Sequence, residues 1–181
     1  QHSWMKHNAM PAGMSYAAME ELAESVPVGS GGVAVLPFGN GAERILENRD
    51  LGAHIHGLNF NRHTRAHLTR AALEGVAFAF AFGIEILQEM DLRMNVLRVG
   101  NDNLFQSRIF ASTVATLAGS RIEVLETTGA VGAARGAGIG AGIYDTPEQA
   151  FRQLERFDDY PPAGDETPYR EACLRWRDQI G

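Results

Sequence analysis

The longest periodic stretch of apolar residues runs from about Arg62 to Met90, with the three- and four-residue spacing that is typical of an amphipathic helix. Asn61 precedes it and is of a residue type that caps helices. The positions expected to face inward are Leu68, Ala72, Val76, Ala79, Ile84 and Leu87. The same spacing predicts a helix over Phe105–Ala118. Gly119 can end that helix, because glycine readily adopts the left-handed conformation found at many helix C-termini.

Short apolar runs outside these two helices predict strands. They lie at Val33–Pro37, Ala53–Phe60, Val96–Val99 and Ile122–Leu125. Strands and helices therefore alternate from residue 53 to residue 143, which favours an α/β sheet with helical crossovers.

The flanking regions are predicted to be mainly helical. Helices are expected over residues 1–10, over 16–25 after the cap Ser15, from Thr146-Pro147, and over 168–180. Residues 157–165 are acidic and contain proline, and they predict a surface connection. We therefore expect a helical and irregular lead-in (1–52), an α/β core (53–145) and C-terminal helices (146–181).

The composition is that of an ordinary globular chain, with 45% hydrophobic and 21% charged residues. The net charge of −6 argues against a nucleic-acid partner. The single Cys173 cannot form an internal disulfide, which favours a cytoplasmic location. No uninterrupted apolar run reaches the roughly 18 residues that span a bilayer, so we expect no membrane partner. The chain begins at Gln1 and not at a Met, and we expect an upstream part of the protein to be missing from it.

The Gly/Ala-rich segment from Gly129 to Gly142 contains neither Gly-x-x-x-x-Gly-Lys nor a correctly spaced Gly-x-Gly-x-x-Gly, and the one lysine of the chain is Lys6. Gly132, Gly136 and Gly140 fall four residues apart, on one face of a helix capped by Thr127 or Thr128. That spacing favours close packing against another backbone. The alternative is that the first turn, at Gly129 and Gly132, contacts a ligand, since a helix N-terminus can hold a phosphate.

A second candidate site is the strand-to-helix turn Val99-Gly-Asn-Asp-Asn103. Open α/β sheets bind ligands at such turns, although an ordinary capped turn has the same pattern. We take Gly100, Asn101, Asp102, Asn103 and Ser107 as candidate ligand-binding residues. The amides of Asn101 and Asn103 can hydrogen-bond to a base or a ribose.

Two further groups of side chains favour structural roles. Arg70 and Glu74 are four residues apart and predict an ion pair across one helical turn. A zinc site built from the four clustered histidines is conceivable, but four imidazoles without a thiolate or carboxylate are an uncommon ligand set. We therefore predict no metal site. The histidines are His54, His56, His63 and His67.

The segment His63-Thr-Arg-Ala-His-Leu-Thr-Arg-Ala-Ala-Leu-Glu-Gly-Val-Ala-Phe78 resembles, almost without a break, a segment of the FGGY carbohydrate kinases. The resemblance extends over roughly residues 1–145, including Trp4-Met-Lys-His7 and the Gly-Ala-x-Gly-Ala-Ala-x-Gly-Ala helix. The element Leu36-Pro-Phe-x-x-Gly-x-Glu-Arg44 favours the xylulokinase-like members. At the turn the family has Gly-Gly-Gly-Ala-x-Ser, and only Gly100 and Ser107 match it.

The resemblance implies a partial ribonuclease H-like (actin-like ATPase) domain that lacks its first strands. It implies the C-terminal, nucleotide-side part of an ATP-dependent sugar kinase, with Gly100–Asn103 and Ser107 against the adenine and ribose and Gly129 and Gly132 near the nucleotide. Catalytic residues, most Mg²⁺ ligands and the sugar or polyol site would lie upstream. A homodimer is compatible with this arrangement.

The altered turn at 100–103 leaves a second interpretation open, a non-catalytic actin-like nucleotide-binding or pseudokinase module. On either interpretation we expect the 181-residue chain by itself to lack kinase activity. The sequence does not identify the sugar.

Overall fold

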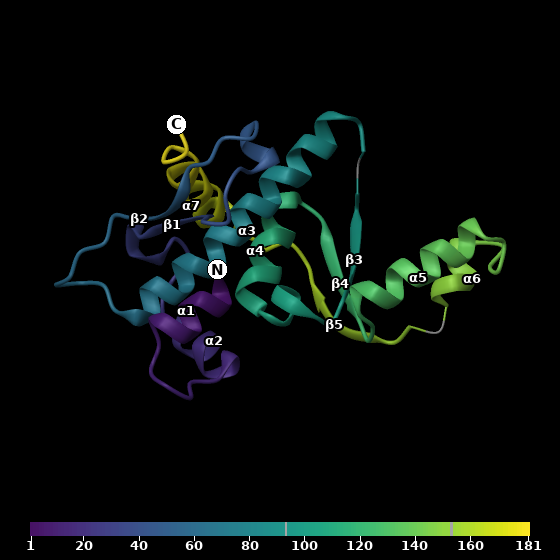
Figure 1. The fold of residues 1–181 in the computed structure, drawn as a ribbon, viewed down its shortest axis with the longest axis horizontal. Helices are drawn as coiled ribbons and strands as arrows, with labels where there is room; N and C mark the ends of the chain where they lie inside the picture. The colour runs from purple at the N-terminus through teal and green to yellow at the C-terminus, as the bar shows by residue number, and fades with distance from the viewer. Residues whose placement is uncertain (93, 153) are drawn as a thin grey trace.

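The structure, a computed structural model, describes residues 1–92, 94–152 and 154–181 (Figure 1). The helices are α1 (His2–Asn8), α2 (Tyr16–Glu24), α3 (Arg65–Glu89), α4 (Arg108–Ala118), α5 (Gly129–Gly140), α6 (Pro147–Phe151) and α7 (Thr167–Arg177). The strands are β1 (Ala34–Phe38), β2 (Gly52–His56), β3 (Val96–Gly100), β4 (Arg121–Leu125) and β5 (Arg156–Tyr160). Short 3₁₀ turns are η1 (Ser30–Gly32), η2 (Arg44–Leu46) and η3 (Asn103–Gln106).

The strands form two small sheets instead of the single sheet expected from the sequence. Strands β1 and β2 pair antiparallel, and β2 ends at His56, earlier than the predicted Phe60. In the other sheet β3 and β4 are parallel, with α4 as the predicted helical crossover, and β5 pairs antiparallel with β4. Strand β1 lies in the predicted lead-in, so both ends of the chain contribute strands.

The prediction of a surface connection over 157–165 is wrong for its first part. Residues Arg156–Tyr160 form β5, and Tyr160 packs into the core beside Ile122. The acidic residues Asp158 and Asp159 hid this strand, because their charge suggested solvent exposure. Asp159 instead pairs with Arg121 at 2.6 Å, and Asp158 accepts a hydrogen bond from the Tyr160 hydroxyl at 2.7 Å.

Three predicted helix caps are confirmed, and two predicted helix starts are wrong. Helix α4 begins at Arg108, after the cap Ser107, and not at Phe105. The hydroxyls of Ser15, Thr128 and Thr146 cap α2, α5 and α6. Helix α3 begins at Arg65, so the prediction that Asn61 caps it is wrong. Thr64 is the cap, and its N–H donates to His67 Nδ1 at 3.2 Å. His67, the third residue of the helix, therefore accepts the hydrogen bond from the cap N–H that a Glu or Gln side chain usually accepts in a capping box.

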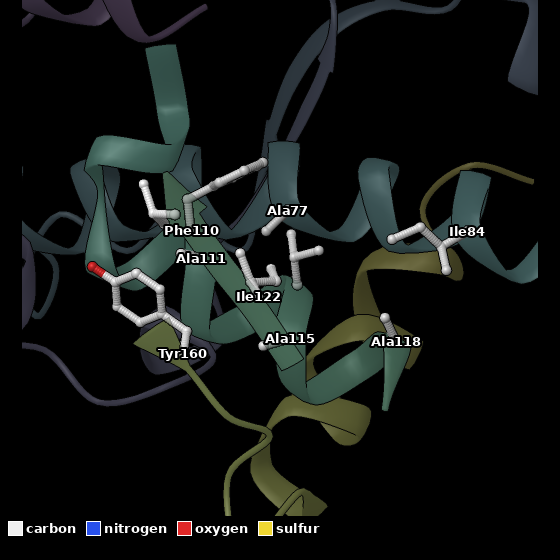
Figure 2. Packing of buried hydrophobic residues seen from close by; sticks show 10 residues of the cluster. Ala77, Ile84, Phe110, Ala111, Ala115, Ala118, Ile122 and Tyr160 are labelled. Atoms are coloured by element: carbon white, nitrogen blue, oxygen red, sulfur yellow. The ribbon is translucent and has the colours of Figure 1, made fainter. Parts of the chain in front are cut away.

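Helix α3 is the centre of the molecule and contacts α2, α4, β1 and α7 (Figure 1). On one side it packs with α4 onto the β3–β4–β5 sheet. Figure 2 shows the buried residues of this region, which include Ala77, Ile84, Phe110, Ala111, Ala115, Ala118, Ile122 and Tyr160. On its other side, α3 packs against buried residues of β1 and α7, among them Leu36, Phe38, Ala172, Cys173 and Trp176. Of the predicted inward positions, Leu87 is wrong, since it is 39% exposed.

Helix α3 is also long and apolar enough to cross a membrane by length and composition. Half of its most apolar 18-residue window is buried inside the protein. Its apolar surface is therefore used for packing, as in the core helix of a globular fold.

The joint between α3 and β1 explains three residues of the family-like segment. The Glu74 carboxylate is buried, pairs with Arg70 at 2.8 Å as predicted, and accepts hydrogen bonds from Gly29 N and Ser30 Oγ at 3.1 and 2.7 Å. At Gly75 the helix lies directly on the Val35 carbonyl, where a Cβ would come closer than 3.0 Å. A buried charge is thus paired and hydrogen-bonded, as burial requires.

Helices α5 and α6 contact each other and extend away from the central helices (Figure 1). A Cβ at Gly132, Gly136 or Gly140 would meet nothing within 4 Å. The prediction that this face is tightly packed is therefore wrong for the described part of the chain. The close approach occurs at Gly138, whose Cβ would lie 2.8 Å from Tyr144 Cε2.

Candidate functional site

The two candidate segments lie together, because they follow the carboxyl ends of the parallel strands β3 and β4. Asn101 N donates to Leu125 O at 2.9 Å, which continues the ladder one residue beyond Gly100. A Cβ at Gly100 would lie 2.7 Å from Thr127 O, so only glycine fits at this position without a shift. The structure thus brings Gly100 next to the start of α5.

A side chain joins the two segments directly. The Asp102 carboxylate accepts a hydrogen bond from Gly129 N, the first residue of α5, at 3.0 Å. The Thr128 hydroxyl accepts from Val131 N at 3.4 Å. Two of the N–H groups that a helix start leaves free are therefore already bonded within the protein.

On one side of these turns is a hollow of about 760 Å³. Gly100, Gly129 and Gly132 line it, together with charged side chains of the open face of the sheet. There the buried Glu123 pairs with Arg98 at 3.0 Å and with Arg156. This volume is in the range of small-molecule sites.

A second hollow of about 720 Å³ lies between α1, α2 and η3. Asn103 and Ser107 line it, with Gln106, Tyr16 and Glu20 among the other side chains. Five of the predicted site residues therefore line one hollow or the other, whereas Asn101 and Asp102 line neither.

The polar side chains of the turn differ in their availability. Within the described part of the chain the Asn103 amide has no hydrogen-bond partner, and the residue is exposed. Asn101 Nδ2 is directed to Glu126 Oε2 at 3.4 Å. Ser107 is 8% exposed and its hydroxyl caps α4 by accepting from Phe110 N at 3.1 Å. A nucleotide contact of Ser107 stays a prediction, and its capping role is what the geometry establishes.

Sequence reasoning missed two side chains at this site. Glu20 Oε1 accepts from Ile109 N at 2.9 Å and so holds α2 against the start of α4. Gln106 Nε2 donates to Asn101 O at 3.2 Å, which closes the turn on itself. Glu20 had no sequence signal, because its partner is 89 residues away.

The clustered histidines take structural positions. His63 Nδ1 accepts from Asn59 N at 3.0 Å, and the His63 and His67 rings lie 5.0 Å apart at the start of α3. His54 and His56 form a separate pair on β2, with ring centroids 5.7 Å apart. Among residues 1–92, 94–152 and 154–181, no three His, Cys, Asp or Glu side chains are grouped to hold a metal ion.

Residues 3–141 match the C-terminal domain of the FGGY family of carbohydrate kinases. The chain belongs to this family. The match covers the lead-in, the turn after β3 and all of α5, so the resemblance seen in the sequence is confirmed.

Named relatives of this FGGY chain are sugar and polyol kinases. It is 32% identical over 143 residues to the L-xylulose/3-keto-L-gulonate kinase of Escherichia coli (strain K12), covering 78% of this chain and 28% of that protein. It is 30% identical over 183 residues to the glycerol kinase of Variovorax paradoxus (strain S110), covering 96% of this chain and 35% of that protein. The chain thus spans about a third of the length of the curated relatives it matches.

Solved structures agree with the family assignment. The xylulose kinase of Rhodospirillum rubrum superposes with a TM-score of 0.81 at 26% identity, over 98% of this chain and 36% of that one. The Plasmodium falciparum glycerol kinase with ADP gives a TM-score of 0.77 at 22% identity, over 98% of this chain and 35% of that one, which is a likeness of fold. The expected fold class, a partial ribonuclease H-like (actin-like ATPase) domain, is confirmed.

Proposed function

We propose that this FGGY chain forms the nucleotide-side wall of an ATP-dependent sugar kinase of the xylulokinase type. One observation carries the proposal. The turn Gly100–Asn103 and the N-terminus of α5 lie side by side at the carboxyl ends of two parallel strands. Open α/β sheets bind their ligands at this edge.

The base and ribose of ATP would occupy the hollow between α1, α2 and η3. Asn103 lines this hollow with an amide that has no partner among the described residues, and Tyr16 and Leu104 supply apolar surface. The phosphates would extend past Gly100 toward Gly129 and Gly132. In the neighbouring hollow Arg98 and Arg156 give a partly compensated positive charge, which suits phosphate oxygens.

The remaining parts of the reaction are assigned to residues outside this chain. Phosphoryl transfer needs a carboxylate base at the sugar hydroxyl and acidic ligands for Mg²⁺. We propose that the rest of the protein supplies both, together with the sugar or polyol site. This chain would then bind and orient ATP and ADP without contributing a catalytic residue. We expect a cytoplasmic enzyme, and the proposed arrangement is compatible with a homodimer.

The second candidate is a non-catalytic actin-like nucleotide-binding or pseudokinase module. The observation that favours it is the turn itself. Two of the three glycines that the family has at this turn are missing after Gly100, and the Asp102 carboxylate already accepts a hydrogen bond from Gly129 N at the start of α5.

The test is calorimetric titration of ATP and of a pentulose against the product of the complete reading frame and its variants. Asn103 has a φ of 51°, in the left-handed region, so Asn103→Leu would add backbone strain to the loss of the amide. Asn103→Gly removes the amide without that strain. We expect it to lose one hydrogen bond, worth about 1 kcal/mol or about fivefold in ATP affinity, with sugar affinity unchanged.

The matched control is Asn95→Gly, just before the opposite end of β3, which should leave ATP affinity unchanged. Equal ATP affinity in the wild type and in Asn103→Gly would place the base elsewhere. Sugar-dependent ATP hydrolysis or phosphoryl transfer by the wild type distinguishes the kinase from the pseudokinase.

A further inference from the structure

Asp102, in the turn after β3, forms hydrogen bonds with two different elements. Its main-chain carbonyl accepts from Phe105 N at 3.2 Å and so begins η3, the turn that carries Asn103. Its carboxylate accepts from Gly129 N at 3.0 Å and so reaches the start of α5. One residue therefore contacts both elements that the nucleotide is proposed to touch.

The second contact crosses 27 residues of sequence and has a favourable electrostatic setting. A helix N-terminus carries a partial positive charge from its free N–H groups, so a carboxylate is stabilised there. Thr128 already accepts from Val131 N, and Gly132 N bonds to Thr128 O. Asp102 thus bonds Gly129 N at a helix start whose N-cap, Thr128, bonds Val131 N and Gly132 N.

The backbone next to this contact leaves little room for the turn to move. Asn101 N is bonded to Leu125 O at 2.9 Å, and a Cβ at Gly100 would contact Thr127 O at 2.7 Å. Gln106 Nε2 also donates to Asn101 O at 3.2 Å. Along the chain, Leu125, which bonds Asn101, precedes Thr127 and Thr128, and Gly129, which bonds the Asp102 carboxylate, follows them. Together they hold the turn and the helix start as one unit.

We propose that Asp102 is a positioning residue that couples the Asn103 turn to the N-terminus of α5, so that the base-contacting amide and the helix end are held in register for the nucleotide. This inference rests on the proposed function and deepens it. Asp102 acts through Asn103 and α5, and it need not touch the ligand.

The experiment uses the product of the complete reading frame and four variants: Asp102→Ala, Asp102→Asn, Asn103→Gly and the double variant Asp102→Ala/Asn103→Gly. Asp102→Ala should weaken ATP binding about fivefold, because it removes one hydrogen bond that orders the site. Asp102→Asn keeps an acceptor oxygen and should restore most of that loss. The double variant should be no weaker than the stronger single variant, because both changes remove the same interaction. Asp50→Ala, at an exposed loop carboxylate, is the matched control and should behave as the wild type.

A second measurement separates this inference from the proposed function. Hydrogen exchange of peptides covering Gly129–Gly132, followed by mass spectrometry, should be about fivefold faster in Asp102→Ala than in the wild type or Asp102→Asn. Unchanged exchange in Asp102→Ala overturns the coupling, and so do fully additive losses of ATP affinity in the double variant. If the wild type binds no ATP while Asp102→Ala still exchanges faster, the proposed function is overturned and the coupling of the turn to α5 stands.

Discussion

Gly75 is the position at which the fold is most sensitive to one added methyl group. Helix α3 rests there on the Val35 carbonyl of β1, and the same carbonyl oxygen accepts a hydrogen bond from Trp176 Nε1 at 2.9 Å. Three elements, α3, β1 and α7, therefore meet at one backbone atom. Gly75→Ala would place a Cβ closer than 3.0 Å to that oxygen and 3.2 Å from the carbonyl carbon.

Neither backbone can move alone, so we expect α3 and β1 to separate by roughly 1 Å and to lose contacts throughout the joint. Overpacking of this kind costs about 1–3 kcal/mol, and we take the upper value because the obstacle is main chain. Loss of the Trp176 hydrogen bond adds about 1 kcal/mol. Alanine recovers about 1 kcal/mol over glycine in a helix interior. The expected loss is about 3 kcal/mol in the free energy of unfolding.

Gly83 provides the matched control in the same helix. A Cβ there would meet nothing within 4 Å, so Gly83→Ala should gain up to about 1 kcal/mol from helix propensity alone. Urea unfolding of the 181-residue chain, followed by far-UV circular dichroism and by the fluorescence of the fully buried Trp176, measures both variants. If Gly75→Ala unfolds at the parental urea concentration or above, the α3–β1 contact is not the constraint described here.

Two further predictions concern stability. Gly136→Leu should leave the free energy of unfolding of the chain unchanged or raise it by up to about 1 kcal/mol, since the position is open. Gly138→Ala should lower the free energy of unfolding, because the added Cβ would displace Tyr144. Equal losses in both variants would restore the interpretation that the Gly132/Gly136/Gly140 face is packed. Burial raises the pKa of Cys173 to about 11 and also raises the pKa of Tyr160, to which Asp158 contributes as well. Both folded pKa values lie above the unfolded ones, so the stabilisation is complete below about pH 9 and is lost as the pH rises toward 11. Urea midpoints measured between pH 8 and pH 11 should fall less steeply in Cys173→Ala, and an identical slope would contradict this.

Local sequence determined the elements whose signals lie within one turn or one strand. Ser15, Gly119, Thr128 and Thr146 ended or began helices where predicted, because capping needs only neighbouring residues. The parallel pair β3–β4 followed from a strand–helix–strand order, which permits few topologies. The resemblance carried by residues 63–78 identified the family, because it combines an ion pair, a helix start and a glycine at fixed spacing.

Contacts between distant segments were decided only by the tertiary structure. The charges of Asp158 and Asp159 predicted a loop, but both residues pair with β4 as part of β5, and Asp159 also forms an ion pair with Arg121. The glycine spacing of α5 predicted a packed face, but spacing alone does not say which backbone approaches, and the contact formed at Gly138.

The same limit applies to the candidate site. The resemblance to the FGGY kinases grouped Gly100–Asn103 with Gly129 near the nucleotide, and the fold joined them through the Asp102 carboxylate. The fold also placed Glu20, from a helix near the N-terminus, against the start of α4. Residue types state what a side chain can donate or accept, whereas the partner depends on which strand ends and helix ends the packed core brings together.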